Sequence, residues 1–175
     1  TNGQIAKRSE ADTIISRKFR MIFHGGLSAG RSVFDFARAL SEVDSIDWQL
    51  SLYGWDVDER LVKLAKKEPR IVINPPFRSD ESLNILNNFD CVVLPYRVID
   101  DNTKYAMPNK FGDAMACHKK ILFNHDLIEI LDLNNELSFG SDFQYGESVK
   151  ETAKSIKLAL EEILSLNTDW DAITR

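Results

Sequence analysis

From Phe19 onward the sequence alternates short apolar runs with segments whose apolar residues recur every three or four positions. The runs have the length of β-strands, and the periodic segments have the spacing of amphipathic helices. The run at residues 91–95, CVVLP, is apolar throughout, as expected of a central parallel strand that is buried on both faces. Strands that alternate with helices predict a Rossmann-like, doubly wound α/β fold, in which helices cover both faces of a parallel sheet.

The same alternation gives the approximate bounds of each element. Strands are expected at residues 20–26, 48–54, 70–74, 91–95, 119–123 and 136–140. Helices are expected between them, including one capped by Ser79 or Asp80, a short one at 127–131, and one in the tail capped by Thr168 or Asp169. Residues 96–105 are expected to form a polar loop. Right-handed crossovers place every strand-to-helix loop at one edge of the sheet, where ligands bind in such folds.

A chain of 175 residues has the length of one domain. Residues 1–18 carry the turn dipeptide Asn2-Gly3 and mixed charge without a clear period, which is typical of an interdomain linker. Residues 19–175 are therefore expected to form the domain that follows it. The net charge of −5 argues against a general surface for nucleic acid or anionic membrane, so any phosphate site must be local.

The two cysteines, Cys91 and Cys117, have apolar neighbours and form no CxxC pair. They are interpreted as small core residues of a reducing compartment. No apolar run approaches the ~20 residues that cross a bilayer, and no signal peptide opens the sequence. A cytoplasmic location is expected.

The segment MPNKFGDAMACHKKILFN, residues 107–124, indicates an anion site. Pro108 suits the first turn of a helix because its φ is already helical and its missing N–H would have no partner there. The free N–H groups of that turn favour an anion. Lys110 adds a positive charge, and Asp113 can accept hydrogen bonds from hydroxyls one turn deeper. This combination favours a phosphate next to a sugar.

Four segments, taken in order, resemble the donor-binding half of group 1 glycosyltransferases of the GT-B fold. They are HGGLSAGRSVFDFARAL, YGWDVDERLVKLA, INPPFRSDESLNILNNFDCVVLPYR and MPNKFGDAMACHKKIL. The first is similar to the family's glycine-rich turn with a basic residue before a helix, and the last to its proline, lysine and acidic helix followed by a strand. No single motif is specific, and the resemblance rests on their order over nearly the whole chain.

Several positions depart from the family pattern. Gly26 stands where many members have arginine, and Arg31 stands at the lysine position and keeps its charge. Asp113 stands at the second glutamate of the usual pair, which implies a contact with the ribose hydroxyls. The first glutamate would fall at Tyr105, which cannot serve as a carboxylate. This points to a branch of the family that lacks it.

The resemblance implies a nucleoside diphosphate sugar as the donor substrate, no metal and no further cofactor. The implied donor-binding residues are Gly25, Gly26, Arg31, Gly54, Asn74, Pro108, Asn109, Lys110 and Asp113. A separate N-terminal domain would hold a glycan or lipid-linked acceptor and any catalytic base, and could bring peripheral contact with the inner face of the membrane. No catalytic residue is assigned, and a role in polysaccharide biosynthesis is expected.

Simpler interpretations stand beside these. His24 ends a strand and is interpreted as structural, and Phe77 could stack on a base or only pack inward. Asp56-Val57-Asp58 has the DxD pattern of metal sites in another glycosyltransferase fold, but acids in a turn that opens a helix cap it and complement its dipole. Two rival functions remain open, namely a Rossmann-like binding module without transferase activity and half of a nucleotide-sugar epimerase.

Overall fold

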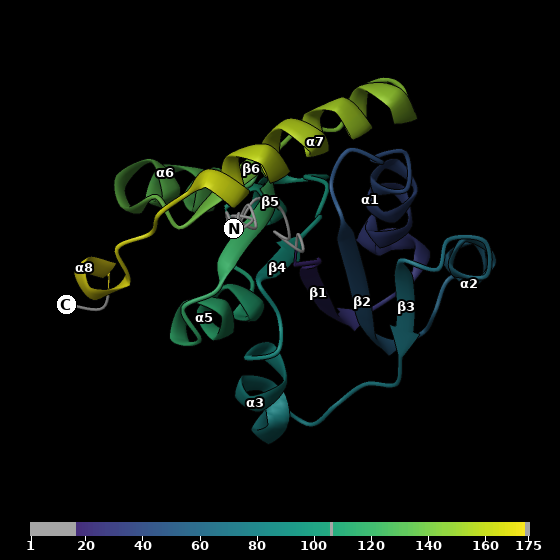
Figure 1. Ribbon diagram of the computed structural model, residues 1–175, viewed down its shortest axis with the longest axis horizontal. Helices are drawn as coiled ribbons and strands as arrows, with labels where there is room; N and C mark the ends of the chain where they lie inside the picture. The colour runs from purple at the N-terminus through teal and green to yellow at the C-terminus, as the bar shows by residue number, and fades with distance from the viewer. Residues whose placement is uncertain (1–16, 106, 174–175) are drawn as a thin grey trace, which may run out of the picture.

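The computed structural model describes residues 17–105 and 107–173, whose strands form one six-stranded parallel sheet (Figure 1). The order across the sheet is β3-β2-β1-β4-β5-β6. The strands are β1 (Phe19–Gly26), β2 (Trp48–Trp55), β3 (Ile71–Asn74), β4 (Cys91–Leu94), β5 (Lys120–Asn124) and β6 (Gly140–Phe143). The chain winds outward from β1 to β3, then returns to β4 on the other side of β1. The prediction of a doubly wound parallel sheet is confirmed, with the switch point between β1 and β4.

Helices cover both faces of the sheet, as predicted. One core cluster joins the sheet to α1 (Val33–Leu40), α2 (Glu59–Ala65) and α7 (Val149–Ser165). The other joins it to α3 (Ser82–Leu86), α5 (Asn109–Ala116), α6 (Ile128–Leu137) and α8 (Trp170–Ile173). All four residues of β4 are buried, because this central strand lies between the two clusters.

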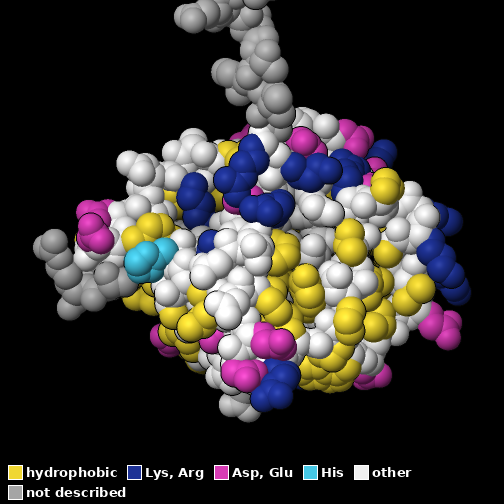
Figure 2. Space-filling model, turned by 60° about the horizontal axis from the view of Figure 1, so that its bottom comes forward, with side chains coloured by type: hydrophobic (Ala, Val, Ile, Leu, Met, Phe, Trp, Pro, Cys, Tyr) yellow, Lys and Arg dark blue, Asp and Glu magenta, His cyan; other side chains and the backbone are white. Residues whose placement is uncertain are grey.

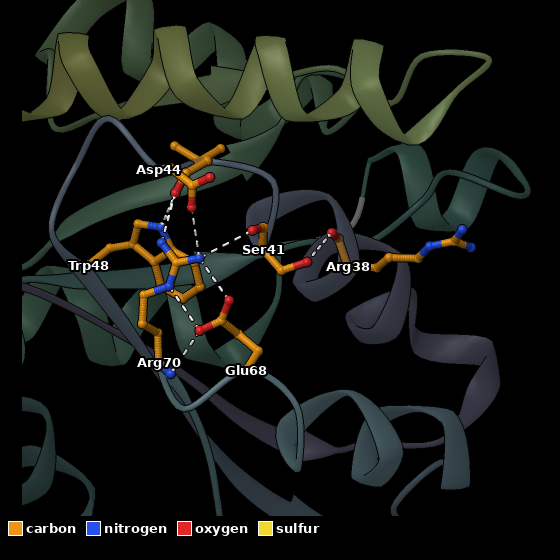
Figure 3. Close-up of polar contacts among 7 residues, drawn as sticks. Arg38, Ser41, Asp44, Trp48, Glu68 and Arg70 are labelled. Carbon is orange, nitrogen blue, oxygen red and sulfur yellow. Dashed lines mark hydrogen bonds and ion pairs between the residues drawn. The ribbon is translucent and has the colours of Figure 1, made fainter.

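The start of β3 is fixed by a set of contacts around Arg70, which we call the Arg70 network (Figure 3). The Arg70 guanidinium bonds both carboxylate oxygens of Glu68, at 2.9 and 2.7 Å, and one of Asp44 at 3.2 Å. It also donates to the backbone carbonyls of Ser41 and Val43 and lies 4.2 Å from the centroid of the Trp48 ring. These bonds tie the start of β3 to the loop between α1 and β2.

The last strand differs from the expected one. Residues 136–137 belong to α6, which is longer than the helix expected at 127–131, and β6 begins only at Gly140. An ideal Cβ at Gly140 would lie 2.1 Å from the carbonyl oxygen of Ile121, so only glycine permits this approach to β5. The Asn134 amide also bonds both backbone groups of Gly140, at 2.8 and 3.2 Å. Tertiary contacts, rather than the apolar run, therefore set the start of β6.

Three helix starts also differ from the expectation. Neither Ser79 nor Asp80 caps the third helix, which opens with a 3₁₀ turn (Ser79–Glu81) after Arg78. The expected loop at 96–105 contains α4 (Asp101–Lys104), because Asp100 accepts a hydrogen bond from the backbone of Thr103 at 2.7 Å. Pro108 is the cap before α5 rather than its first helical residue. In the tail, Asp169 caps α8 as predicted, through the backbone N–H of Ala172 at 3.0 Å.

The remaining expectations concern the cysteines, the linker and the membrane. Cys91 is fully buried and Cys117 partly so, and both are free thiols. Asn2-Gly3 and most of the expected linker at 1–18 lie outside the described residues. Within residues 17–105 and 107–173, every helix is too short or too polar to cross a bilayer.

Candidate functional site

The candidate site lies where β1 and β2 end and α5 begins. Gly25 and Gly54 are paired in register at these strand ends, and an ideal Cβ at Gly54 would lie 1.9 Å from the Gly25 carbonyl oxygen. Gly25 has a φ of 133°, and a Cβ there would lie 2.9 Å from both Cε and Nζ of Lys110. The glycines therefore have two uses: Gly54 lets the strand ends approach, and Gly25 lets the Lys110 side chain lie across β1.

Lys110 is the centre of the site. Its Nζ lies 5.5 Å from the centroid of the Phe23 ring and 5.8 Å from that of Tyr96, so two aromatic faces support the ammonium. Burial lowers the pKa of Lys110, the charge of Arg31 lowers it further, and Asp113 partly opposes both. Among the described residues, no carboxylate forms an ion pair with Lys110 or with Arg31. Two cations thus share one crevice with unused capacity for an anion.

A cavity of about 270 Å³ lies on one side of Lys110, and we call it the His24 cavity. It is lined by His24, Gly25, Tyr53, Trp55, Pro76, Phe77, Ser79, Ser82, Asn109, Lys110 and Asp113. Asp113 accepts a hydrogen bond from the Ser82 hydroxyl at 3.2 Å, which leaves further lone pairs for a ligand. The cavity therefore offers a carboxylate beside aromatic walls.

His24 is held neutral in this cavity. Burial lowers its pKa to about 4, and the Lys110 charge adds to that effect against the opposing charge of Asp113. Its Nε2 is buried without a hydrogen-bond partner among the described residues. The Phe77 ring covers the imidazole, with ring centroids 5.2 Å apart, and also meets the Tyr53 ring at 5.3 Å. A histidine that was interpreted as structural therefore lies in the cavity wall.

A second cavity, of about 400 Å³, lies on the other side of Lys110, and we call it the Arg31 cavity. Its lining includes the start of α5, the α4 turn and the residue that follows Pro95. It is lined by Arg31, Tyr96, Asp100, Asn102, Thr103, Pro108, Asn109, Lys110 and Leu127. The first N–H groups of α5 have no acceptor within the helix. Together with Arg31 and Lys110 they give this cavity several groups that can bind an anion.

The structure brings together six of the nine residues expected to bind the donor. Gly25 and Asp113 line the His24 cavity, Arg31 and Pro108 line the Arg31 cavity, and Asn109 and Lys110 line both. Gly26, Gly54 and Asn74 line neither. Gly26 lies against the Arg31 side chain, with its ideal Cβ 3.7 Å from Nε, and Asn74 donates weakly to the Val72 carbonyl at 3.5 Å.

Sequence reasoning left out Tyr96, Tyr53 and Ser82. Tyr96 supports Lys110, and burial raises its pKa to about 12. Its only sequence signal is its place directly after the apolar run CVVLP, at the end of a central strand. Ser82 lies on α3, and its contact with Asp113 on α5 depends on helix packing that no local pattern encodes.

The DxD pattern has the structural role expected of it. The Asp58 carboxylate caps α2 through the backbone N–H of Arg60 at 2.9 Å, and it also pairs with the Arg60 guanidinium at 2.6 Å. This bonding to Arg60 lowers the pKa of Asp58. Asp56 has a left-handed φ of 57° in the turn. Across the described residues, no three His, Cys, Asp or Glu side chains gather as a metal site would require.

A third cavity, of about 350 Å³, lies at the opposite edge, where the strands begin. Its basic side chains already have partners: Arg17 pairs with Asp90 at 2.7 Å, and Lys120 donates to the carbonyls of Ile163 and Leu166, both at 2.7 Å. Figure 2 likewise shows a face on which Lys and Arg side chains gather close to Asp and Glu side chains. Basic charge that is already paired gives less attraction for an anion than the charge around Lys110.

Comparisons with known proteins place the fold. Compared as a sequence, the chain matches no family model and no curated protein. As a structure, it matches the C-terminal domain of a group 1 family glycosyl transferase, LpcC, from Francisella tularensis. That match has 14% identity and a TM-score of 0.61, over 90% of this chain and 84% of that domain. The chain has the fold of a GT-B glycosyltransferase domain.

Two longer proteins give the same result. The lipopolysaccharide outer core galactosyltransferase WaaB matches with 13% identity and a TM-score of 0.61, over 89% of this chain and 42% of WaaB. HepE from Anabaena, solved in complex with UDP-glucose, matches with 16% identity and a TM-score of 0.62, over 91% of this chain and 44% of HepE. The chain thus spans about two fifths of these proteins. At these identities the likeness establishes the fold alone.

Proposed function

We propose that this chain is the donor-binding domain of a glycosyltransferase, which transfers a sugar from a nucleoside diphosphate sugar to a glycan or lipid-linked acceptor. One observation carries the proposal. Arg31 ends the 3₁₀ turn before α1, Lys110 lies in the first turn of α5, and both line one crevice, with no carboxylate paired to either among the described residues. A diphosphate would supply the anionic partner that neither cation has among the described residues, and the first turn of α5 would add N–H donors.

The two cavities suit the two ends of such a donor. With the diphosphate at Lys110, the His24 cavity would receive the nucleoside, where Asp113 can accept from ribose hydroxyls and the aromatic walls can pack on a base. The Arg31 cavity would then receive the sugar, among the polar groups of Asp100, Asn102 and Thr103. HepE, a protein with this fold, was solved with UDP-glucose, which supports a nucleotide sugar as the ligand.

The rest of the reaction would need the other half of the enzyme. WaaB and HepE are each more than twice the length of this chain, so a separate N-terminal domain would hold the acceptor and any catalytic base. Arg31, Lys110 and the α5 N-terminus would offset the charge of the leaving diphosphate without a metal or other cofactor. We propose that the enzyme is cytoplasmic and acts in polysaccharide biosynthesis. Its N-terminal domain would make the contact with the membrane. The chain alone would bind donor but transfer no sugar.

Titration with UDP and GDP, followed by NMR chemical shifts and calorimetry, tests the donor site. Shifts should concentrate around both cavities, and Arg31→Ala or Lys110→Ala should each weaken binding about ten- to a hundredfold, since hydrogen bonds to charged groups are worth about 1.5–3 kcal/mol. The double variant should depart from additivity if the two cations hold one diphosphate. Shifts confined to the edge where the strands begin would refute the proposal.

Two carboxylates provide matched controls. Asp113→Ala should weaken nucleotide binding less than the loss of either cation, because it removes only the contact with the ribose. Asp56→Ala should leave the affinity unchanged, because Asp56 lines neither cavity. If Asp56 proved essential while both cations could be removed without loss, a metal-dependent site elsewhere would replace this one.

A further inference from the structure

Tyr145 lies in the loop between β6 and α7, lines neither cavity, and contacts both loops that build the site. Its hydroxyl donates to the Pro95 carbonyl at 2.6 Å and lies 3.3 Å from the Ser32 carbonyl oxygen. Burial raises the pKa of Tyr145, so the hydroxyl stays protonated and remains a donor. One side chain thus joins the β1–α1 loop to the β4–α4 loop, although Ser32 lies 113 residues away in sequence.

Arg97 strengthens the same junction. Its guanidinium lies 3.9 Å from the centroid of the Tyr145 ring and pairs with Asp35 on α1 at 3.7 Å. Its backbone N–H donates to the Ser32 hydroxyl at 3.4 Å. Ser32 has a left-handed φ of 59°, a conformation that costs energy for a residue with a Cβ and persists only where its surroundings impose it. Tyr145 and Arg97 supply those surroundings.

The two joined loops carry the groups that flank Lys110. Ser32 directly follows Arg31, and Pro95 and Arg97 are the two neighbours of Tyr96. Tyr96 is held further by the Asn124 amide, which donates to its carbonyl at 2.9 Å. The distance between Arg31 and the Tyr96–Lys110 pair therefore depends on how the two loops are joined. A diphosphate needs that distance fixed, because misplaced charges cost affinity or must be ordered on binding.

We propose that Tyr145 is a positioning residue, whose hydroxyl holds Arg31 at the spacing from Lys110 that a diphosphate requires. This inference rests on the proposed function of the site. It predicts that Tyr145 acts only through the two loops, and chiefly through Arg31. The phenol ring packs edge-on against Phe143, with centroids 5.2 Å apart, so the ring and the hydroxyl have separate contacts and can be tested separately.

The test compares Tyr145→Phe, which removes the hydroxyl alone, with Ser155→Ala. The Ser155 hydroxyl accepts from the backbone N–H of Gln144 at 2.8 Å, so the control loosens the same β6–α7 loop without touching the other two. Tyr145→Phe should weaken UDP or GDP binding about three- to tenfold, as the loss of one hydrogen bond allows, and Ser155→Ala less than about twofold. Amide exchange should rise at residues 31–33 and 95–97 in Tyr145→Phe only.

The same substitution in an Arg31→Ala background isolates the mechanism. If Tyr145 acts through Arg31, Tyr145→Phe should change affinity less than about twofold there, whereas a general loss of packing would cost the same in both backgrounds. Wild-type affinity in Tyr145→Phe, or an equal loss in both backgrounds, would overturn the positioning role and leave the donor site intact. Absence of any Arg31-dependent binding of UDP or GDP by the unsubstituted chain would overturn both.

Discussion

The Arg70 network and the site around Lys110 are both cationic centres of one sheet, the first where a strand begins and the second where strands end, yet their bonding is opposite. Arg70 has two carboxylates, two carbonyls and an aromatic face around it (Figure 3). Its bonds to Glu68, and to a lesser extent to Asp44, raise the pKa of Arg70, and the bonds from Arg70 lower the pKa of Glu68. Lys110 has aromatic faces but no ion-pair partner among the described residues, and its pKa is lowered. The surroundings of Arg70 favour its charged form, whereas burial of Lys110 disfavours its charged form.

The contrast separates stability from binding. Removing a charge that has a full set of acceptors strands those acceptors and destabilises the folded chain, whereas a buried charge without acceptors costs free energy that a ligand can recover. The Arg70 network lies where β3 begins, and the Lys110 site lies where β1 and β2 end. Because they lie at opposite edges, a change in one should leave the other unaffected. The following substitutions test this separation.

The largest expected effect is on stability, at Arg70. Arg70→Met keeps an apolar side chain and the backbone bond to Glu68, but removes the guanidinium over Trp48 and every side-chain bond to Glu68, Asp44 and the two carbonyls. Hydrogen bonds to charged groups and the cost of stranded acceptors predict a loss of about 2–3 kcal/mol in the free energy of unfolding, measured with urea. Nucleotide affinity should not change.

Lys157→Met is the control for Arg70. Lys157 forms an exposed ion pair with Glu161, at 3.6 Å on α7, and its loss should cost less than about 0.5 kcal/mol. If Arg70→Met weakened nucleotide binding as much as it weakened the fold, the two centres would be coupled and the comparison would fail.

A smaller effect is expected at His24, and it depends on pH. Its folded-state pKa of about 4 lies below the ordinary value of about 6.5, so below pH 6.5 the unfolded chain takes up a proton that the folded chain does not. Stability is unaffected above pH 6.5 and falls as the pH drops toward 4. Between pH 7 and 5 the loss should be about 1–2 kcal/mol, the lower value allowing for partial solvent access.

His24→Phe, compared with the unsubstituted chain at each pH, isolates this contribution. The Glu68 carboxyl has its pKa lowered by Arg70, so its own contribution is lost only when the pH falls below the ordinary glutamate range. The two centres should therefore fail in separate pH windows. An identical decline between pH 7 and 5 in both chains would show that His24 is not the group responsible.

Two strands of the sheet show what the sequence could predict. The strand at residues 91–95 was predicted correctly because an apolar run bounded by Asp90 and Pro95 leaves little choice. The prediction of a strand at residues 136–140 was wrong, because the start of β6 depends on the close approach of Gly140 to Ile121 and on the Asn134 amide. Such contacts join distant segments and leave no local pattern.

The candidate site divides in the same way. Arg31, Lys110 and Asp113 could be proposed because charged residues near helix starts are visible in a sequence. Tyr96 and the wall position of His24 could not, because each depends on side chains from other elements, such as Asn124 and Phe77. Gly54, also among the residues expected to bind the donor, lines neither cavity and lies against Gly25 at the strand ends.

The smallest effect on stability is expected at Lys110, and its sharpest contrast is with Lys120. Burial lowers the pKa of both Lys110 and Lys120, but Lys120 donates to two carbonyls at the end of α7. Lys120→Met should therefore cost about 1–2 kcal/mol, whereas Lys110→Met should leave stability unchanged or raise it by up to about 1 kcal/mol, since it relieves burial and repulsion from Arg31. Urea unfolding beside UDP titration would measure both. A stabilised Lys110→Met that no longer binds UDP would mark its charge as kept for the ligand, and a destabilisation equal to that of Lys120→Met would mark it as part of the fold.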